Sequence, residues 1–451
     1  MKYRISSYIA LCIGLISLAG CSDCLDDIRP KDQIPSDNLT ENDLEKVLNG
    51  VYATMEDHVH NMWWDGDVKG ENYRPGPGGN LSDPLDMSPS TSAVRSRWNN
   101  CFTSLKQVNF LIENYETNSN KESATVRQSG GTGYFFRALI YYNAVTRWGK
   151  APILRKRTYD DVPLSGESDV WAFILEDLDK AEQLLPPFSD RFYVSASACD
   201  ALKARVYIAI GDKSNALTYA DRVITASSFA LADNSTDWAK TFISNSSSKE
   251  LVFALANKRT KSTILMHQKI NDVDGSWDYA PATAIYSNLY ANTAIKSGDI
   301  RAKATFNSDP TRTIKFANGM DGQFITNEVP SQTPLPVLRL AEMYLIKAEA
   351  QGAQAGLSTM KEFMQKRYSA INLPASMSET DFQNLILDER QRELYSEGFR
   401  WYDLKRTGRL DLFSTLNGRT HLMYWPIPQS EIDLAGSDKY PQNPGYGSSK
   451  N

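Results

Sequence analysis

Residues 201–224 read ALKARVYIAIGDKSNALTYADRVI, with a helical pattern on each side of the pair Gly211-Asp212. Alanines recur at helical spacing in both halves, where two helices have to approach each other closely. The stretch predicts a helix, a tight turn at Gly211-Asp212 and a second helix.

The spacing in this stretch is typical of the tetratricopeptide hairpin, in which small residues and a large aromatic interlock two helices. Leu340, Tyr344, Ala348 and Gly352 repeat part of the pattern near the other end of the chain. We therefore expect an all-α protein that contains tetratricopeptide-type hairpins.

Helical spacing of apolar residues also predicts helices between the start of the chain and this hairpin. They cover residues 40–56, 98–115, 134–148 and 169–185. Thr40 is the expected N-cap of the first, with Asp43 at the third helical position. Two long polar segments, 57–97 and 230–336, interrupt the helices and are expected to hold functional loops.

The composition indicates a folded protein with no basic surface for nucleic acid. The chain has 451 residues, of which 41% are hydrophobic, and a net charge of -5. This balance excludes a disordered tail. We expect no nucleic-acid partner, because such a partner requires clustered positive charge.

The amino terminus resembles an export signal for a lipoprotein. Lys2 and Arg4 precede the apolar run 8–19, which is too short to cross a bilayer and ends in the box Leu18-Ala19-Gly20-Cys21. We expect residues 1–20 to be removed and Cys21 to receive lipid, so that the chain is tethered to a membrane by its first residue. The acidic residues that follow resemble signals for the outer face of an outer membrane; they are Asp23, Asp26 and Asp27.

Four segments late in the chain resemble the SusD/RagB family of outer-membrane glycan-binding lipoproteins. They are VLRLAEMYLIKAEAQ (337–351), ERQRELYSEGFRWYDLKRTG (389–408), YWPIPQSEID (424–433) and YPQNPGYG (440–447). The resemblance covers nearly the whole chain, including the lipid site and the stretch 137–152. One departure is Gly130-Gly131-Thr132-Gly133, where relatives more often begin a helix with Glu and Ala.

The resemblance implies a single domain from residue 21 to 451 that captures an oligosaccharide or polysaccharide without catalysis. Its parts are a helical region at 38–230, a loop-rich insertion at 230–336 and a second helical region at 337–451. The implied partner is a SusC-like TonB-dependent outer-membrane transporter. Capture of peptides, as in RagB-like relatives, and a surface glycoside hydrolase are the alternatives.

The charge pattern of the predicted helix around residue 390 indicates a structural role for its glutamates and not a catalytic one. Glu389 and Glu393 lie one helical turn apart, with Arg390 and Arg392 beside them and Glu397 and Arg400 within reach. A hydrolase could use two such carboxylates as its catalytic pair. The neighbouring arginines oppose this, because they lower a carboxyl pKa and make it a poor general acid.

Aromatic and polar residues in the two insertions are the candidate ligand surface. A sugar needs flat aromatic faces for stacking and polar groups for its hydroxyls. The candidates are Trp63, Trp64, Asp65, Asn72, Tyr73 and Arg74 in the first insertion, and Asp274, Trp277, Asp278 and Tyr279 in the second. The alternative is that one tryptophan of the first pair fills the core and that Tyr286 and Tyr290 pack beneath the loop. By contrast, helical spacing predicts core positions for Trp98, Trp171 and Trp401.

No cofactor is expected from the remaining motifs. The glycine-rich 130–133 segment lacks the lysine of a phosphate loop, and His58 and His60 lack the spacing of a zinc pair on one helix face. Cys101 and Cys199 are expected to be core residues. We expect a solvated turn around Gly275, and a calcium site formed by oxygen donors is the alternative. The donors are Asn271, Asp272, Asp274 and Asp278.

Overall fold

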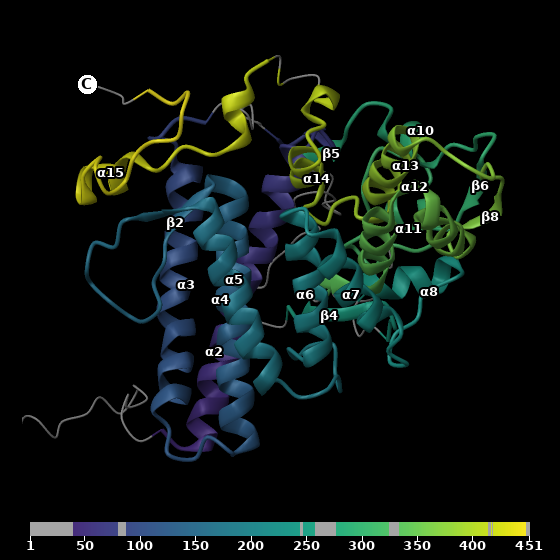
Figure 1. Ribbon diagram of the computed structural model, residues 1–451. Coiled ribbons are helices and arrows are strands. Elements are labelled where there is room, and N and C mark those ends of the chain that lie inside the picture. Colours follow the sequence, from purple (N-terminus) through teal and green to yellow (C-terminus); the bar gives the residue numbers. More distant parts are fainter. Residues whose placement is uncertain are drawn as a thin grey trace, which may run out of the picture. The chain divides into compact units, whose positions relative to one another are not determined.

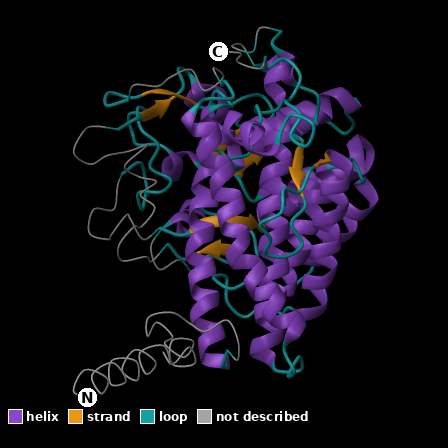
Figure 2. Ribbon diagram, turned by 90° about the vertical axis from the view of Figure 1, so that its left-hand side faces the viewer, coloured by secondary structure: helices purple, strands orange, loops and turns teal. Residues whose placement is uncertain are grey.

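The computed structural model describes residues 39–79, 87–243, 247–257, 277–323, 333–413, 416 and 418–447. Most of them lie in helices, and the strands are short (Figure 1, Figure 2). The predicted all-α class is confirmed. Two compact units are present, Met1–Lys46 and Val47–Asn451. The lipid site Cys21 and most of the calcium candidates, Asn271, Asp272 and Asp274, lie outside the described residues.

The first described helix begins where the capping residues predict. The Asp43 backbone N–H donates to Thr40 Oγ1 at 3.2 Å, and the Thr40 N–H donates to Asp43 Oδ2 at 3.3 Å, ahead of α2 (Glu41–Trp63). This reciprocal pair satisfies backbone donors at the helix start. The helix continues past residue 56, the predicted end, and passes into the π-helical turn η1 (Trp64–Val68).

Three further helices, α3 (Ser92–Thr117), α4 (Ala124–Trp148) and α5 (Glu167–Leu184), pack side by side (Figure 1). Helix α4 starts at Ala124 and not at Tyr134, so the glycine-rich segment lies inside a buried helix. A Cβ on Gly130 would lie 2.4 Å from the Tyr115 ring, and one on Gly133 would lie 2.9 Å from Ile112. These glycines allow α3 and α4 to approach closely.

The predicted hairpin is present as α6 (Ala196–Ala209) and α7 (Lys213–Ile224). Gly211 in the turn has a φ of +81°, a left-handed conformation that favours glycine. The Asp212 side chain caps α7 by accepting from the Asn215 N–H at 3.0 Å. The rings of Tyr207 and Tyr219 stack across the hairpin with centroids 5.5 Å apart.

The partial repeat at 340–352 is the first helix of another pair. α12 (Leu340–Gln365) is interrupted at Gly352, where φ is 69° and ψ is 179°, so its two halves are separate helical segments. It packs against α7 and against α13 (Glu379–Glu393), which α14 (Arg400–Arg406) follows. The glycine supplies the turn in this repeat as Gly211 does in the first.

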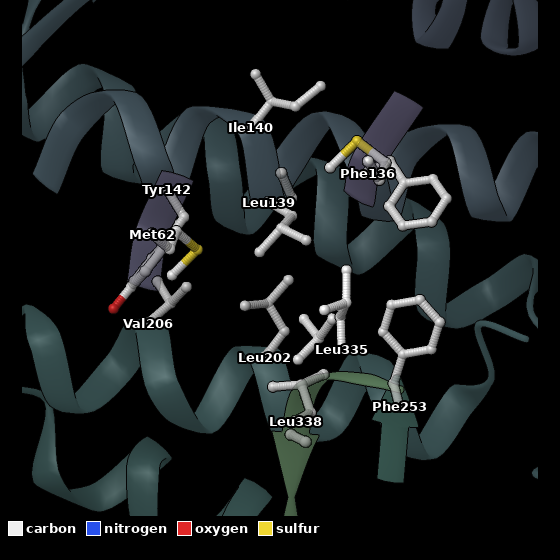
Figure 3. Close-up of a cluster of buried hydrophobic side chains, with 14 of the residues drawn as sticks. Met62, Phe136, Leu139, Ile140, Tyr142, Leu202, Val206, Phe253, Leu335 and Leu338 are labelled. Carbon is white, nitrogen blue, oxygen red and sulfur yellow. The ribbon is translucent and has the colours of Figure 1, made fainter. Parts of the chain in front are cut away.

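The main core lies where α4 and α6 meet the ladder formed by β4 (Leu251–Leu255) and β7 (Leu335–Arg339) (Figure 3). Phe136 of α4 packs on Phe253 of β4 with ring centroids 6.0 Å apart. Leu202 of α6 lies close by in the same cluster (Figure 3). Strand β4 is buried along its whole length because it crosses this core.

Short strands and short helices occupy the segments between and after the long helices. The other strands form antiparallel pairs: β1 (Tyr73–Pro75) with β5 (Tyr279–Pro281), β2 (Lys150–Pro152) with β3 (Leu164–Gly166), and β6 (Lys296–Asp299) with β8 (Tyr368–Ile371). The short helices are α8 (Ser235–Ala239), η2 (Lys240–Phe242), α10 (Ile285–Tyr290), α11 (Ala302–Thr305), η4 (Leu410–Leu412), η5 (Thr420–Met423) and α15 (Gln429–Ala435).

Most of the predicted core residues are buried. Trp98 and Trp401 are in the interior, as are Cys101 and Cys199, which confirms the prediction for all four. Trp171 is only half-buried, because it lies near the start of α5 beside a small cavity between α4, α5 and α14.

The carboxylates of α13 are buried in a cluster of ion pairs. Glu393 accepts from Arg339 at 2.8 Å, from Arg367 at 2.9 Å and from Arg301 at 3.1 Å. Glu389 pairs with Arg392 at 2.7 Å, as its spacing predicts. The other arginines come from distant segments, so the cluster ties the 230–336 insertion to α13.

Candidate functional site

The two insertions predicted to bind ligand lie side by side. Strand β1 of the first pairs with β5 of the second, and the Gly76 N–H donates to the Asp278 carbonyl at 2.7 Å. The Trp64 indole N–H also donates to the Tyr279 hydroxyl. We call the resulting region the β1–β5 surface; it consists of Trp64, Arg74, Arg97, Trp277, Asp278, Tyr279 and Arg312.

Glycines in the first insertion make this contact possible. A Cβ on Gly76 would lie 2.3 Å from the Trp277 carbonyl oxygen, and one on Gly79 would lie 2.0 Å from that of Asp278. Both distances are too short for any side chain. The glycines therefore allow the backbones of the two insertions to touch.

Trp64 is held in a fixed orientation and remains half-buried. The Arg97 guanidinium carbon lies 5.4 Å from the centre of its ring. Arg97 Nε donates to Asp65 Oδ1 at 3.3 Å, and Arg147 Nε donates to Asp65 Oδ2 at 2.6 Å. The buried Asp65 thus orients the arginine that contacts the tryptophan ring.

The second tryptophan of the surface, Trp277, is more deeply buried than Trp64. Trp277 is 8% exposed, and the Arg312 guanidinium carbon lies 3.9 Å from its ring centre, a cation–π arrangement. Its indole nitrogen is buried and has no hydrogen-bond partner among the described residues. Arg74 is exposed and Asp278 is half-buried. The surface therefore combines aromatic rings with both charged and hydrogen-bonding groups.

Several residues predicted to face the ligand belong to the interior, which corrects the sequence interpretation. Trp63, Asp65, Asn72 and Tyr73 are all buried, and Trp63 donates to Ser396 Oγ at 2.8 Å. Trp63 is the tryptophan of the pair that fills the core, because α2 continues to this position and turns its side chain inward. Tyr279 is also largely buried, and it reaches the surface through its contact with Trp64.

Two arginines of the surface were missed by sequence reasoning. Arg97 lies on α3, where the helical pattern shows only a polar position, and Arg312 lies in a stretch without periodicity. Each is recognised only from the tryptophan that it contacts in space. Of the other aromatics considered, Tyr290 is buried and Tyr286 is partly exposed beside it.

A buried carboxylate joins the first insertion to the turn after α13. Asp67 accepts from Asn72 Nδ2 at 2.5 Å, from the Ser396 N–H at 3.2 Å and from the Gly398 N–H. Burial raises the pKa of Asp67 to about 7, against the lowering effect of these hydrogen bonds. Asp67 therefore holds the segment that leads into β1 against the turn after α13.

Comparison with known proteins identifies the family. The SusD family matches residues 98–446. The chain belongs to the SusD family. The match begins at residue 98, so three of the seven residues of the β1–β5 surface precede it; they are Trp64, Arg74 and Arg97.

Individual relatives share the chain's length or its fold. SusD-like protein P38 of Formosa agariphila is 22% identical over 94% of this chain and 96% of its own length. The starch-binding protein SusD of Bacteroides thetaiotaomicron is 31% identical over 31% of this chain and 26% of its own length. A laminarin-binding SusD-like protein superposes with a TM-score of 0.70 at 22% identity, covering 91% of this chain and all of that chain. The structural likeness shows that the fold is shared.

The alternative of a catalytic carboxylate pair is disfavoured by the chemistry of Glu389 and Glu393. Burial alone raises the pKa of Glu389, but Arg392 and Arg301 beside it lower that pKa to about 2. The pKa of Glu393 is likewise well below its usual range because three arginines surround it. Neither group holds a proton at neutral pH, so neither can act as a general acid.

Metal and membrane signals are absent from the described part of the chain. No cluster of three or more His, Cys, Asp or Glu side chains there is arranged to hold a metal ion. His58 is buried against Ser104, with a ring nitrogen 2.9 Å from Oγ. Among the described helices, none has the length and apolar character needed to span a bilayer.

Proposed function

We propose that this SusD-family protein captures an oligosaccharide or polysaccharide at the cell surface on its β1–β5 surface. The observation that supports this is the contact of Trp64 with Tyr279, beside the pairing of β1 with β5, which brings together aromatic residues from segments far apart in the sequence. Starch and laminarin, named for two relatives, are both glucans, which makes a glycan the favoured ligand class.

The residues of the surface suit a sugar chain. The half-buried Trp64 offers an apolar face for the C–H side of a pyranose ring, while Arg74 and Asp278 reach the ring's hydroxyl groups. Arg97 and Arg312 hold the two tryptophans in place through cation–π contacts. Binding of this kind needs no general acid or nucleophile.

Replacement of Trp64 by alanine is expected to weaken glycan binding by about 1–3 kcal/mol, the scale of a lost aromatic anchor. The measurement is isothermal titration against soluble starch, laminarin, xylan and mannan, with a casein digest to detect peptide capture. Tyr159→Ala removes a fully exposed ring elsewhere and is the matched control. Wild-type affinity in the Trp64 variant would contradict the assignment, and binding of the peptides alone would favour the RagB-like alternative.

The glycan binder is proposed to be anchored by lipid at Cys21. Cys21→Ala is expected to release the protein from the outer membrane or to leave an uncleaved precursor, because the thiol that takes the lipid is missing. Membrane fractionation and intact mass measure this. Normal cleavage together with unchanged fractionation would exclude anchoring at this residue.

Delivery of the glycan inward requires a partner, which we propose is a SusC-like TonB-dependent transporter. A tethered binder cannot by itself move a ligand across the membrane. Extraction in mild detergent is expected to recover a TonB-dependent barrel with this chain, through the helices of the tetratricopeptide region. Repeated isolation of the chain alone, with chemical crosslinking also negative, would count against the partnership.

A further inference from the structure

The β1–β5 surface carries more positive than negative charge. Of its seven residues one is an acid, Asp278, and three are arginines, Arg74, Arg97 and Arg312. The buried Asp65 gives a single negative charge to both Arg97 and Arg147. The described groups of this region therefore leave an excess of positive charge, although the chain as a whole has a net charge of -5.

Arg312 contacts Trp277 with the face of its guanidinium group and keeps the edge of that group free. The guanidinium carbon lies 3.9 Å from the Trp277 ring centre. A stacked guanidinium group still has its N–H donors in its own plane, where they can bind another molecule. Among the described residues, only the backbone N–H of Arg312 donates, to Asn307 Oδ1 at 2.9 Å. The half-buried side chain can therefore donate to a ligand.

Arg74 supplies a second guanidinium group beside the same tryptophan. Alternation along β1 places Tyr73 in the interior and Arg74 on the exposed side. Among the described residues the Arg74 guanidinium has one long contact, 3.4 Å from Nη1 to the Pro75 carbonyl, and no ion pair. Gly76, two residues further on, is so close to Trp277 that a Cβ there would lie 2.8 Å from Cδ1 of the ring.

Two arginines without a carboxylate partner suit a sugar that carries one. The planar guanidinium group matches the two oxygens of a carboxylate, and hydrogen bonds between charged groups are roughly twice as strong as neutral ones. A neutral sugar can accept from the same arginines but leaves their charge uncompensated. The Trp64 face stacks on the C–H side of either kind of ring.

We propose that the glycan captured on the β1–β5 surface is acidic, and that Arg74 and Arg312 bind the carboxylates of its uronic acid rings. This inference rests on the proposed function, because it specifies the ligand of the same surface. Trp64 stacks on a ring of the chain, and the arginines beside Trp277 donate to the carboxylates. Arg97 remains bound to Asp65 and contributes positive charge nearby.

The test compares acidic polysaccharides with carboxyl-reduced forms of the same chains. Polygalacturonate, alginate and a glucuronan are titrated by calorimetry against the full-length protein, each beside the neutral polymer obtained by reducing its carboxylates to alcohols. At least one acidic polymer is expected to bind about tenfold more tightly than its reduced form, the scale of a hydrogen bond between charged groups. Raising sodium chloride from about 0.05 to about 0.5 M should weaken the binding of the acidic polymer only.

Arginine variants identify the residues responsible. Arg74→Gln and Arg312→Gln are each expected to weaken binding of the acidic polymer about tenfold and that of its reduced form less than about twofold. Arg74→Lys keeps the charge without the planar fork and should recover only part of the affinity. Arg74→Gln should melt as the wild type does, because the side chain is exposed.

Arg222→Gln is the matched control for these variants. It removes a positive charge that is 48% exposed on α7, a helix that packs on α6 and α12, and should leave both affinities unchanged. A sulfated galactan is the control ligand, because it offers negative charge without a planar carboxylate.

The outcomes separate this inference from the proposed function. If the reduced polymers bind as tightly as the acidic ones and Trp64→Ala weakens both, the ligand is a neutral glycan and only the present inference fails. Insensitivity to both glutamine variants, or equally tight binding of the sulfated galactan, would overturn the recognition of carboxylates by these arginines. Binding of no polysaccharide at all would contradict the proposed function as well.

Discussion

Glu393→Gln is expected to lower the free energy of unfolding by about 3–5 kcal/mol, the cost of removing one partner from a buried ion pair. Glu393 is 0% exposed and accepts from Arg301, Arg339 and Arg367. Glutamine keeps the shape of the side chain but removes its charge. The three guanidinium groups then remain buried with too little negative charge between them.

Urea denaturation followed by circular dichroism measures the effect. Glu176→Gln is the matched control, because Glu176 also accepts two bonds from an arginine, Arg155 at 2.8 and 2.9 Å, but on the solvent-exposed side of α5. Exposed pairs contribute about 1 kcal/mol or less. If the two variants lost similar amounts of unfolding free energy, Glu393 would not stabilise the fold through ion pairs that are shielded from water.

Trp401→Ala is expected to cost about 3–5 kcal/mol of stability, because it leaves a cavity that the surroundings fill only in part. The Trp401 ring is fully buried, stacks on Phe413 with centroids 4.8 Å apart, and lies 4.2 Å from Lys69 Nζ. Thermal and chemical denaturation both measure the loss.

Tyr159→Ala serves as the control for this prediction as well. Tyr159 is fully exposed, so its removal should change stability by no more than about 0.5 kcal/mol. A Trp401 variant that unfolds at the wild-type denaturant concentration would mean that the small cluster around α14 contributes little to the fold. The pair of variants thus compares a buried and an exposed ring.

The helices were predictable because their signals are local. The cap formed by Thr40 and Asp43, the turn at Gly211-Asp212 and the break at Gly352 depend on residues within a few positions of one another. Helix ends were less predictable: α2 and α4 both extend beyond their predicted bounds. In α4 the reason is tertiary, because packing on α3 offsets the roughly 1 kcal/mol that each glycine costs in a helix.

The candidate site was predictable only as a set of residue types. Aromatic and polar residues in both insertions indicated a ligand surface, and Trp64, Arg74 and Asp278 do remain at least partly exposed. Their neighbours Trp63 and Asp65 belong to the interior, and no periodic pattern separates adjacent residues in such a stretch. The two arginines beside the tryptophans have no sequence signal at all.

The sequence by itself determined the helical class, the hairpins and the family resemblance, because helical spacing, turn glycines and ordered motifs are written along the chain. Only the tertiary structure decided that β1 pairs with β5 and that Arg301, Arg339 and Arg367 share Glu393. Each of these joins residues far apart in sequence. Their proximity results from the packing of many side chains at once, and no short stretch of sequence specifies it.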